Sequence, residues 1–409
     1  MDWFRLFWSA HLFLVISIAH FASRIPSKMT HKPALFSPIK VGAMALKHRV
    51  VMAPLTRGRA TNPELAPTPD IVEFYAQRAA TPGTLLIAEA TYVSERGAGV
   101  ANLPGIWSQV QIEAWRLVTK AVHARGSAIV VQLWALGRCG SRKWLAERGF
   151  DLVGASSVPE LTGEALEYSG LTVDPDEIGV VPRELSTEEV RQYVRDFAQA
   201  AINAREAGFD GVEIHAANGY LLDQFLSEET NKRTDEYGGS VANRARLTLE
   251  VIDAVSAAIG ADRTGLRISP FGVLSRDDPG AVEQHAHILA ILERRARDGD
   301  PLAYVHTIEH CEHGRSAATG AHIIIRRATD FVGTIWRGAW IRTQGFDRES
   351  ALEIADTDPR VLVGFGRGFI ANPDLVKRLR RNLPWNELDE STYYTGGAHG
   401  LTDYPEYEG

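Results

Sequence analysis

The sequence has few of the residues that mark several common classes of protein. Only two cysteines, Cys139 and Cys311, occur in 409 residues. They form neither a closely spaced metal-binding pattern nor the dense disulfide framework of a small secreted protein, so a reducing compartment is expected for the folded part. Basic residues do not exceed acidic ones, since 44 Lys and Arg against 51 Asp and Glu give a net charge of −7. Because nucleic-acid binding usually needs a concentrated basic surface, no nucleic-acid partner is expected.

Repeats, linkers and dinucleotide-binding motifs are also missing. The sequence contains no internal repeat, no low-complexity tract and no stretch typical of a linker between independent domains. It has no Gly-x-Gly-x-x-Gly unit, so a Rossmann domain is not predicted. With 45% hydrophobic residues, the chain can bury a large core. We therefore interpret residues 33–409 as one domain and residues 1–32 as a hydrophobic N-terminal extension.

This extension contains a long apolar run. Residues 3–21 are almost wholly hydrophobic, and their number is close to the roughly 20 residues that a helix needs to cross a bilayer. Within this run, residues 12–19 have the length of the hydrophobic region of a signal peptide. Arg24, Lys28 and Lys32 follow, which would keep the rest of the chain cytoplasmic if the run inserts into a membrane. Three interpretations stay open: a membrane anchor, a targeting signal, and a segment upstream of a translation start at Met29.

The rest of the chain alternates short β-branched runs with longer amphipathic stretches. This alternation is typical of parallel strands joined by helices. Eight strands are predicted, which is the number in a (β/α)8 TIM barrel, although an open sheet also fits the pattern. The predicted strands are 49–54, 84–91, 127–134, 210–215, 265–269, 302–307, 339–342 and 361–364. The predicted helices are 108–125, 187–207, 241–259, 281–297 and 373–383, the second of them beginning with a capping box of Ser186 and Glu189.

One predicted strand ends in residues that could carry out chemistry. The segment Gly211–Leu226 places His215 at the carboxyl end of a strand, with Asn218 and Tyr220 just after it. In a parallel barrel that end is the catalytic face. Neutral donors from His215 and Asn218 could polarise one carbonyl oxygen, and the phenol of Tyr220 could supply a proton. The alternative is that these side chains merely satisfy one another within the core.

Together with six other segments, these residues resemble the Old Yellow Enzymes, a family of flavin-dependent ene-reductases built on a TIM barrel. The resemblance runs from about Leu35 to the end of the chain. The other segments are APLTR (53–57), VQLW (131–134), RTDEYGGS (233–240), GLRISP (265–270), GFGR (364–367) and NPDL (372–375). Tyr393-Tyr394 and Ala398-His399-Gly400 resemble the fungal, yeast-like branch. The resemblance implies a single TIM barrel that binds FMN.

The resemblance also implies which residues contact the flavin ring. Gln132 and Arg267 match residues at its pyrimidine edge, where Arg267 would offset the negative charge that forms on reduction. Thr56 matches a hydroxyl near the flavin C4=O, although a threonine there could also only cap a turn. The backbone at Pro54 and Leu55 would line the ring.

The phosphate of FMN is expected beyond the last strand. Gly366 and Arg367 follow that strand, where barrel enzymes commonly bind phosphate through backbone amides and a basic side chain. Gly345, in the preceding loop, is a looser match to the family. Ala90 stands near the flavin, where the family usually has a glycine.

The implied reaction reduces the C=C bond of an α,β-unsaturated carbonyl compound, an enone or enal, with NADPH as the transient hydride donor. In the implied ping-pong cycle, hydride passes from NADPH to the flavin and then to Cβ of the substrate. His215 and Asn218 would hold the carbonyl oxygen while Tyr220 protonates Cα. Trp134 and Tyr394 match family residues that orient the substrate and shape its pocket. Family members often form dimers, so a homodimer is compatible with the resemblance.

Two other functions stay open. One is a flavin-dependent desaturase or double-bond isomerase that acts on a biosynthetic intermediate, and the other is a membrane-tethered flavin-binding protein without turnover. The loop 309–328 departs from the family's usual sequence, so the substrate is left undefined. It contains His310, Cys311 and His313, but ligands so close in sequence need a distant partner to hold an ion, so we expect a solvated loop and no metal. The polar segment 233–240 is expected to be structural.

Overall fold

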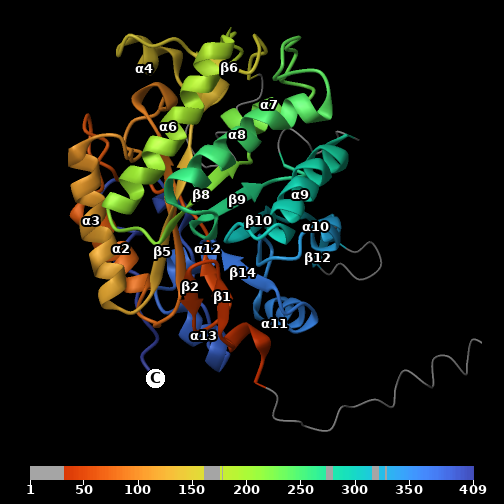
Figure 1. Cartoon of the computed structure of the whole chain (residues 1–409). Helices are drawn as coiled ribbons and strands as arrows, with labels where there is room; N and C mark the ends of the chain where they lie inside the picture. The colour runs from red at the N-terminus through yellow and green to blue at the C-terminus, as the bar shows by residue number, and fades with distance from the viewer. Residues whose placement is uncertain (1–31, 161–175, 177, 273–279, 316–321, 328) are drawn as a thin grey trace, which may run out of the picture. The chain divides into compact units, whose positions relative to one another are not determined.

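Eight parallel strands close into a barrel, and their order around the ring follows the chain (Figure 1). The computed structural model describes residues 32–160, 176, 178–272, 280–315, 322–327 and 329–409, and one compact unit begins at Ala34. The strands are β3 (Val50–Met52), β4 (Leu85–Tyr92), β5 (Ala128–Trp134), β8 (Gly211–Ala216), β9 (Thr264–Ile268), β10 (Tyr304–Ile308), β13 (Trp340–Thr343) and β14 (Val361–Phe365). Parallel pairing of β14 with β3 closes the ring. The TIM barrel and all eight predicted strands are thus confirmed.

A helix follows every strand and packs on the outside of the barrel (Figure 1). These helices are α2 (Pro69–Arg78), α3 (Gln109–Ala124), α6 (Thr187–Glu206), α8 (Val241–Ile259), α9 (Ala281–Arg297), α10 (Asp330–Ile335), α11 (Arg348–Thr357) and α13 (Leu375–Arg381). The first four predicted helices are confirmed, and the capping box of Ser186 and Glu189 is present at the start of α6. The helices α2, α10 and α11 were not predicted, because each is too short for a clear apolar periodicity.

The second half of the chain contains one wrong prediction and one helix that was not predicted. The last predicted helix, 373–383, is confirmed as α13, which lies within those bounds, whereas the short helix α12 (Arg367–Ala371) before it was not predicted. Pro373 lies between them and has no N–H to continue a helix. The loop predicted over 309–328 contains an antiparallel hairpin of β11 (His310–Arg315) and β12 (His322–Arg327).

The side chains inside the barrel change from apolar to polar along its axis. At the amino ends of the strands, an apolar cluster packs against a hairpin of β1 (Ile39–Val41) and β2 (Met44–Leu46). Its barrel members are Val51, Leu85, Ile87, Val130, Tyr304, Ile341 and Leu362. Because side chains alternate along a strand, positions two residues further on face the same interior. Outside β4, three of these positions are polar, namely Gln132, His306 and Thr343.

A bulge in β4 changes which residues face the interior. Ala88 pairs with Val131 and Ala90 pairs with Gln132, so Glu89 is an extra residue in the ladder. Leu86 and Ala88 belong to the cluster between the barrel and its helices, and regular alternation would direct Ala90 the same way. The bulge reverses this alternation. Ala90 therefore faces the mouth of the barrel.

The connections outside the barrel are longest after β5. Residues 137–185 contain α4 (Arg142–Ala146), β6 (Val153–Gly154) and β7 (Arg183–Glu184). Another short helix, α7 (Leu221–Leu226), follows β8, and α4, β6 and α7 gather at one end of the barrel (Figure 1). The apolar run 3–21 lies outside the described residues. Among the described helices, none is long and apolar enough to cross a membrane.

Candidate active site

A cavity opens at the carboxyl ends of the first five strands of the barrel. The volume of this cavity is about 150 Å³. Its lining residues are Pro54, Leu55, Thr56, Ala90, Gln132, Trp134, His215, Asn218, Tyr220 and Arg267. Each of them was a candidate site residue in the sequence. The structure therefore brings together ten predicted residues that lie at the ends of five different strands or just after them.

Three aromatic rings pack closely at this cavity. The ring of Trp134 is stacked on the His215 imidazole, with centroids 6.1 Å apart. Tyr220 meets both rings edge-on, at 4.6 Å from Trp134 and 5.2 Å from His215. Tyr92 stacks on the other side of Trp134, with centroids 5.3 Å apart. Because each ring restricts its neighbours, His215 and Tyr220 are held in fixed orientations.

The turn that carries Asn218 and Tyr220 is fixed by hydrogen bonds. Asn218 has a left-handed backbone, with φ of 61°, and its N–H donates to Ser269 Oγ over 3.0 Å. The next N–H, of Gly219, donates to Asp223 Oδ2 over 2.8 Å. Burial raises the pKa of Asp223 to about 7, although the Gly219 N–H and Arg138 act in the opposite direction. The turn therefore depends on a carboxyl group that titrates near neutral pH.

His215 is a neutral donor at physiological pH. Its side chain is buried, and burial, followed by the positive charge of Arg267 and by His306, holds its pKa well below the usual value. Its Nδ1 makes no hydrogen bond with the described part of the chain, and neither does the buried Trp134 Nε1. Buried polar groups in native proteins almost always have a partner. These two atoms at the cavity are therefore suited to a bound molecule.

Two polar residues behind the cavity were missed at the level of sequence. Gln132 Nε2 donates to Glu213 Oε1 over 2.7 Å, and Glu213 Oε2 lies 2.8 Å from His306 Nδ1. Glu213 and His306 are both fully buried inside the barrel. The sequence did contain a signal for Glu213. It is a charged residue two positions before His215 on a buried strand, so its side chain points to the same interior face.

The loop after β3 is tied to the C-terminal segment. Arg57 and Arg59, both buried, lie within three residues after Thr56. Arg57 donates to the carbonyls of Tyr393 and Gly400, and Arg59 donates to those of Thr392, Tyr393, Gly397 and His399, all within 2.8–3.2 Å. Tyr394 is not among the ten lining residues, but it is partly buried against the cluster that includes Trp134 and Tyr220. The two arginines therefore fix the path of the segment that carries Tyr394.

The predicted phosphate-binding residues lie outside this cavity. Gln344 and Gly345 both have left-handed backbones, with φ of 87° and 71°, in the turn after β13. Gly366 lies beside Leu55 and directly precedes α12. The side chain of Arg367 is 68% exposed, and its guanidinium is 3.8 Å from Glu390. The structure thus leaves this arginine accessible at the rim, next to the first loop of the cavity.

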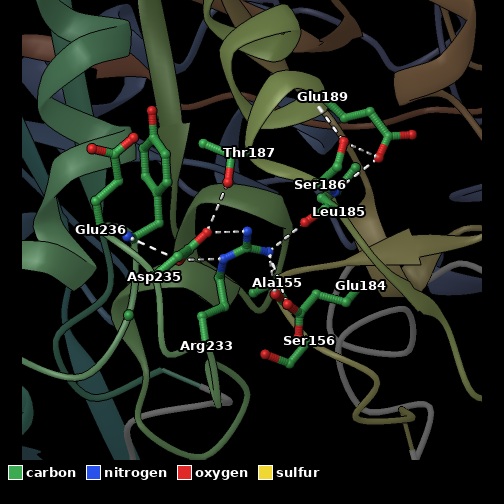
Figure 2. Close-up of polar contacts among 12 residues, drawn as sticks. Ala155, Ser156, Glu184, Leu185, Ser186, Thr187, Glu189, Arg233, Asp235 and Glu236 are labelled. Carbon is green, nitrogen blue, oxygen red and sulfur yellow. Dashed lines mark hydrogen bonds and ion pairs between the residues drawn. The ribbon is translucent and has the colours of Figure 1, made fainter.

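The polar segment 233–240 has structural contacts (Figure 2). The buried Arg233 forms an ion pair with Asp235 and donates to the carbonyls of Ala155 and Leu185, as Figure 2 shows. Asp235 in turn accepts from Thr187 at the start of α6. This network joins the segment after α7 to the long connection after β5. It lies apart from the ten lining residues.

No group of residues suited to a metal ion occurs among the described residues. The side chains of His310, Cys311 and His313 lie outside what the structure describes, so the expectation for that loop stays a prediction. Cys139 is buried, and burial raises the pKa of its thiol to about 12. It is therefore a poor nucleophile.

The chain is similar to known flavin enzymes over almost its whole length. Residues 34–386 match the model of the NADH:flavin oxidoreductase / NADH oxidase family. The chain is 43% identical over 380 residues to enoate reductase 1 of Kluyveromyces lactis, covering 91% of this chain and 94% of that protein. The solved structure of Old Yellow Enzyme from Pichia sp. matches with a TM-score of 0.81 at 37% identity, covering 92% of this chain and 94% of that one. Morphinone reductase matches with a TM-score of 0.79 at 37% identity, covering 92% of this chain and 97% of that one.

Proposed function

Because the chain belongs to the Old Yellow Enzyme family, we propose specific roles for its own residues in the reduction of an α,β-unsaturated carbonyl compound. The chain is an FMN-dependent oxidoreductase that takes hydride from NAD(P)H and reduces the C=C bond of unsaturated compounds. The roles rest mainly on one observation, which is that His215, Asn218, Tyr220, Gln132 and Arg267 line a single cavity.

The residues present fit FMN. Gln132 offers an amide and Arg267 a cation at one side of the cavity, which suits the pyrimidine edge of a flavin that becomes anionic on reduction. Thr56, in the loop after β3, offers a hydroxyl, and Ala90 is small enough to leave room for the ring. The Gly366 and Arg367 amides and the exposed Arg367 guanidinium suit the phosphate. Bound FMN supplies the hydride that reaches the substrate's β-carbon.

His215 and Asn218 hold the substrate's carbonyl oxygen. A neutral imidazole has one N–H donor, and the amide of Asn218 adds a second. Two donors on one oxygen polarise the carbonyl and stabilise the negative charge that grows there as hydride reaches Cβ. Because burial and Arg267 keep His215 neutral, it donates a hydrogen bond without giving up a full proton.

Tyr220 supplies the proton to the α-carbon. A phenol stays protonated at neutral pH and can act as a general acid. Its ring is held edge-on to both His215 and Trp134, so its hydroxyl has a fixed place relative to the carbonyl donors. Trp134 and Tyr394 shape the pocket beside it. Hydride and proton arriving from opposite faces would give net trans addition.

The reaction sequence can be tested with the FMN-loaded protein under anaerobic conditions. NADPH is expected to bleach the flavin, and 2-cyclohexen-1-one added after removal of NADP⁺ is expected to restore the yellow colour and yield cyclohexanone. Conversion of an enone without NAD(P)H would instead indicate an isomerase. A flavin that NADPH bleaches but no enone reoxidises would contradict the proposal.

Several finer points remain proposals with their own tests. We expect NADPH to be preferred over NADH, which the same bleaching experiment measures with each donor. We expect the protein to be cytoplasmic and to form a homodimer. Light scattering would measure the mass of the particle and so test the homodimer. Contact of residues 3–21 with a membrane is tested by vesicle co-sedimentation of the full chain beside a chain that begins at Met29.

A further inference from the structure

A continuous chain of hydrogen bonds crosses the inside of the barrel behind the cavity. Gln132 Nε2 lies 2.7 Å from Glu213 Oε1, Glu213 Oε2 lies 2.8 Å from His306 Nδ1, and His306 Nε2 lies 2.5 Å from Thr343 Oγ1. The four residues come from β5, β8, β10 and β13. None of them is more than 7% exposed, and only Gln132 lines the cavity.

At neutral pH, only one assignment of protons is consistent with these four hydrogen-bonded residues. Burial alone would raise the pKa of Glu213, but His306, Arg267 and the Gln132 amide outweigh it and hold that pKa below its ordinary value. Burial lowers the pKa of His306, opposed by Glu213. Glu213 is therefore an ionised carboxylate, which can only accept hydrogen bonds. His306 is neutral and donates from Nδ1, which leaves its Nε2 to accept from the Thr343 hydroxyl.

This direction of donation fixes the Gln132 amide. A glutamine side chain can usually exchange its oxygen and nitrogen by rotating half a turn. Here a carboxylate that only accepts must face the amide nitrogen, because an oxygen in that place would meet negative charge. The carbonyl oxygen of Gln132 is therefore left for the cavity, together with its second N–H.

Glu213 also acts on Arg267, which lies on the neighbouring strand β9, two positions beyond Gly265, the residue that pairs with Glu213. The two charges interact strongly enough for Arg267 to contribute to the low pKa of Glu213, and the attraction is mutual. Arg267 stabilises an anionic reduced flavin, whereas a carboxylate behind it reduces the net positive field. Removing the charge of Glu213 should therefore make the flavin easier to reduce.

We propose that Glu213 and His306 are positioning residues that orient Gln132 toward the pyrimidine edge of FMN and that lower the flavin's reduction potential by partly offsetting Arg267. This inference rests on the placement of that edge in the proposed function. Neither residue touches the substrate, and each acts through Gln132 or Arg267.

The test is the midpoint potential of the bound flavin, measured by equilibration with a reference dye. In Glu213→Gln the charge is lost with little change of shape, so the ratio of reduced to oxidised flavin at a fixed poise should rise at least tenfold. His306→Leu should act in the same direction, because a Glu213 carboxylate without its donor takes up a proton. His306→Gln keeps an N–H donor and should restore the wild-type ratio.

Glu309→Gln is the matched control, since Glu309 is equally buried but pairs with Arg342 and Thr329 instead of the cavity residues. An unchanged potential in both Glu213→Gln and His306→Leu, a fall in the ratio, or an equal rise in Glu309→Gln would overturn the proposal. If Glu213→Gln does not fold, the pair His306→Leu and His306→Gln decides. The failure of this inference can be told from failure of the proposed function. If the wild-type protein binds FMN and reduces enones but the variants have the wild-type midpoint potential, only this inference is refuted.

Discussion

Two arginines assigned to the same cofactor, Arg267 and Arg367, lie in opposite environments. Arg267 is 8% exposed at the end of β9, in register with His215 on one side and His306 on the other. Arg367 has a side chain that is 68% exposed, and the nearest carboxylate, Glu390, is 3.8 Å away. Surface ion pairs of this kind contribute little to stability.

The comparison separates two parts of one binding site. The ring end, around Arg267, is held by strand register, aromatic packing and buried hydrogen bonds before any ligand arrives. The phosphate end, around Gly366 and Arg367, is made of turns and an accessible side chain. We therefore expect changes at the ring end to alter chemistry, and changes at the phosphate end to alter retention of the cofactor. Four substitutions test this division.

Tyr220→Phe should have the largest effect, and it should fall on chemistry alone. Loss of a general acid typically costs about 10²–10⁴-fold in rate. Stopped-flow measurement should show that slowing in the reoxidation of reduced flavin by an enone, with reduction by NADPH and FMN affinity nearly unchanged. Equal losses in both half-reactions would show that Tyr220 has a different role.

Arg367→Ala should be the converse case, with affinity lost and chemistry kept. A charged hydrogen bond contributes about 1.5–3 kcal/mol, which corresponds to roughly 10- to 100-fold in the dissociation constant of FMN. Fluorescence titration of the apoprotein measures this, and riboflavin, which lacks the phosphate, is the control ligand. A variant that loses both ligands equally would break the division between the two ends.

Asp223→Asn should change how the stability of the fold depends on pH, because Asp223 is a buried carboxyl group at the ring end. Because the folded-state pKa of Asp223 is raised to about 7, its protonated form stabilises the fold fully below its ordinary pKa. This contribution is lost as pH rises to about 7, at about 1.4 kcal/mol per pH unit. Asparagine still accepts from the Gly219 N–H but does not ionise. Thermal unfolding from pH 5 to pH 8 should therefore show the variant gaining on wild type as pH rises to about 7, and parallel curves would contradict the assignment.

Thr56→Ala should have the smallest effect, on the redox balance of the flavin. A neutral hydrogen bond contributes about 1 kcal/mol, so the ratio of reduced to oxidised flavin at a fixed potential should fall by roughly two- to tenfold. FMN affinity should change less, and Thr56→Ser should behave as wild type. A larger change in affinity than in potential would place Thr56 with the phosphate end.

The sequence predicts the ring end well because its residues sit at strand ends. Once β5, β8 and β9 are recognised, parallel pairing places Gln132, His215 and Arg267 at one mouth without further information. The bulge at Glu89 was not predictable, because nothing in a run of eight buried residues marks the extra one. Regular alternation along β4 would put Ala90 on the outer face of the barrel, and only the resemblance to the family placed it near the flavin.

The second half of the chain was predicted less completely. A loop was expected where the hairpin of β11 and β12 lies. The two strands pair antiparallel and outside the barrel, so the pattern of parallel strands joined by helices did not predict them. The partnership of Glu213 with His306 joins strands that are 93 residues apart, so local pattern gives no sign of it. Both of their strands pair with β9, so the register of three neighbouring strands brings these two side chains together inside the barrel.

The hydrogen bonds from Arg57 and Arg59 to the C-terminal segment affect how the substrate preference of this enzyme can change during evolution. Their main acceptors are backbone carbonyls, at Thr392, Tyr393, Gly397, His399 and Gly400, which every amino acid possesses. Side chains along that segment can therefore be exchanged while its course over the barrel stays the same. The segment that carries Tyr394 is thus a place where new substrate preferences can arise by mutation without disturbing the fold.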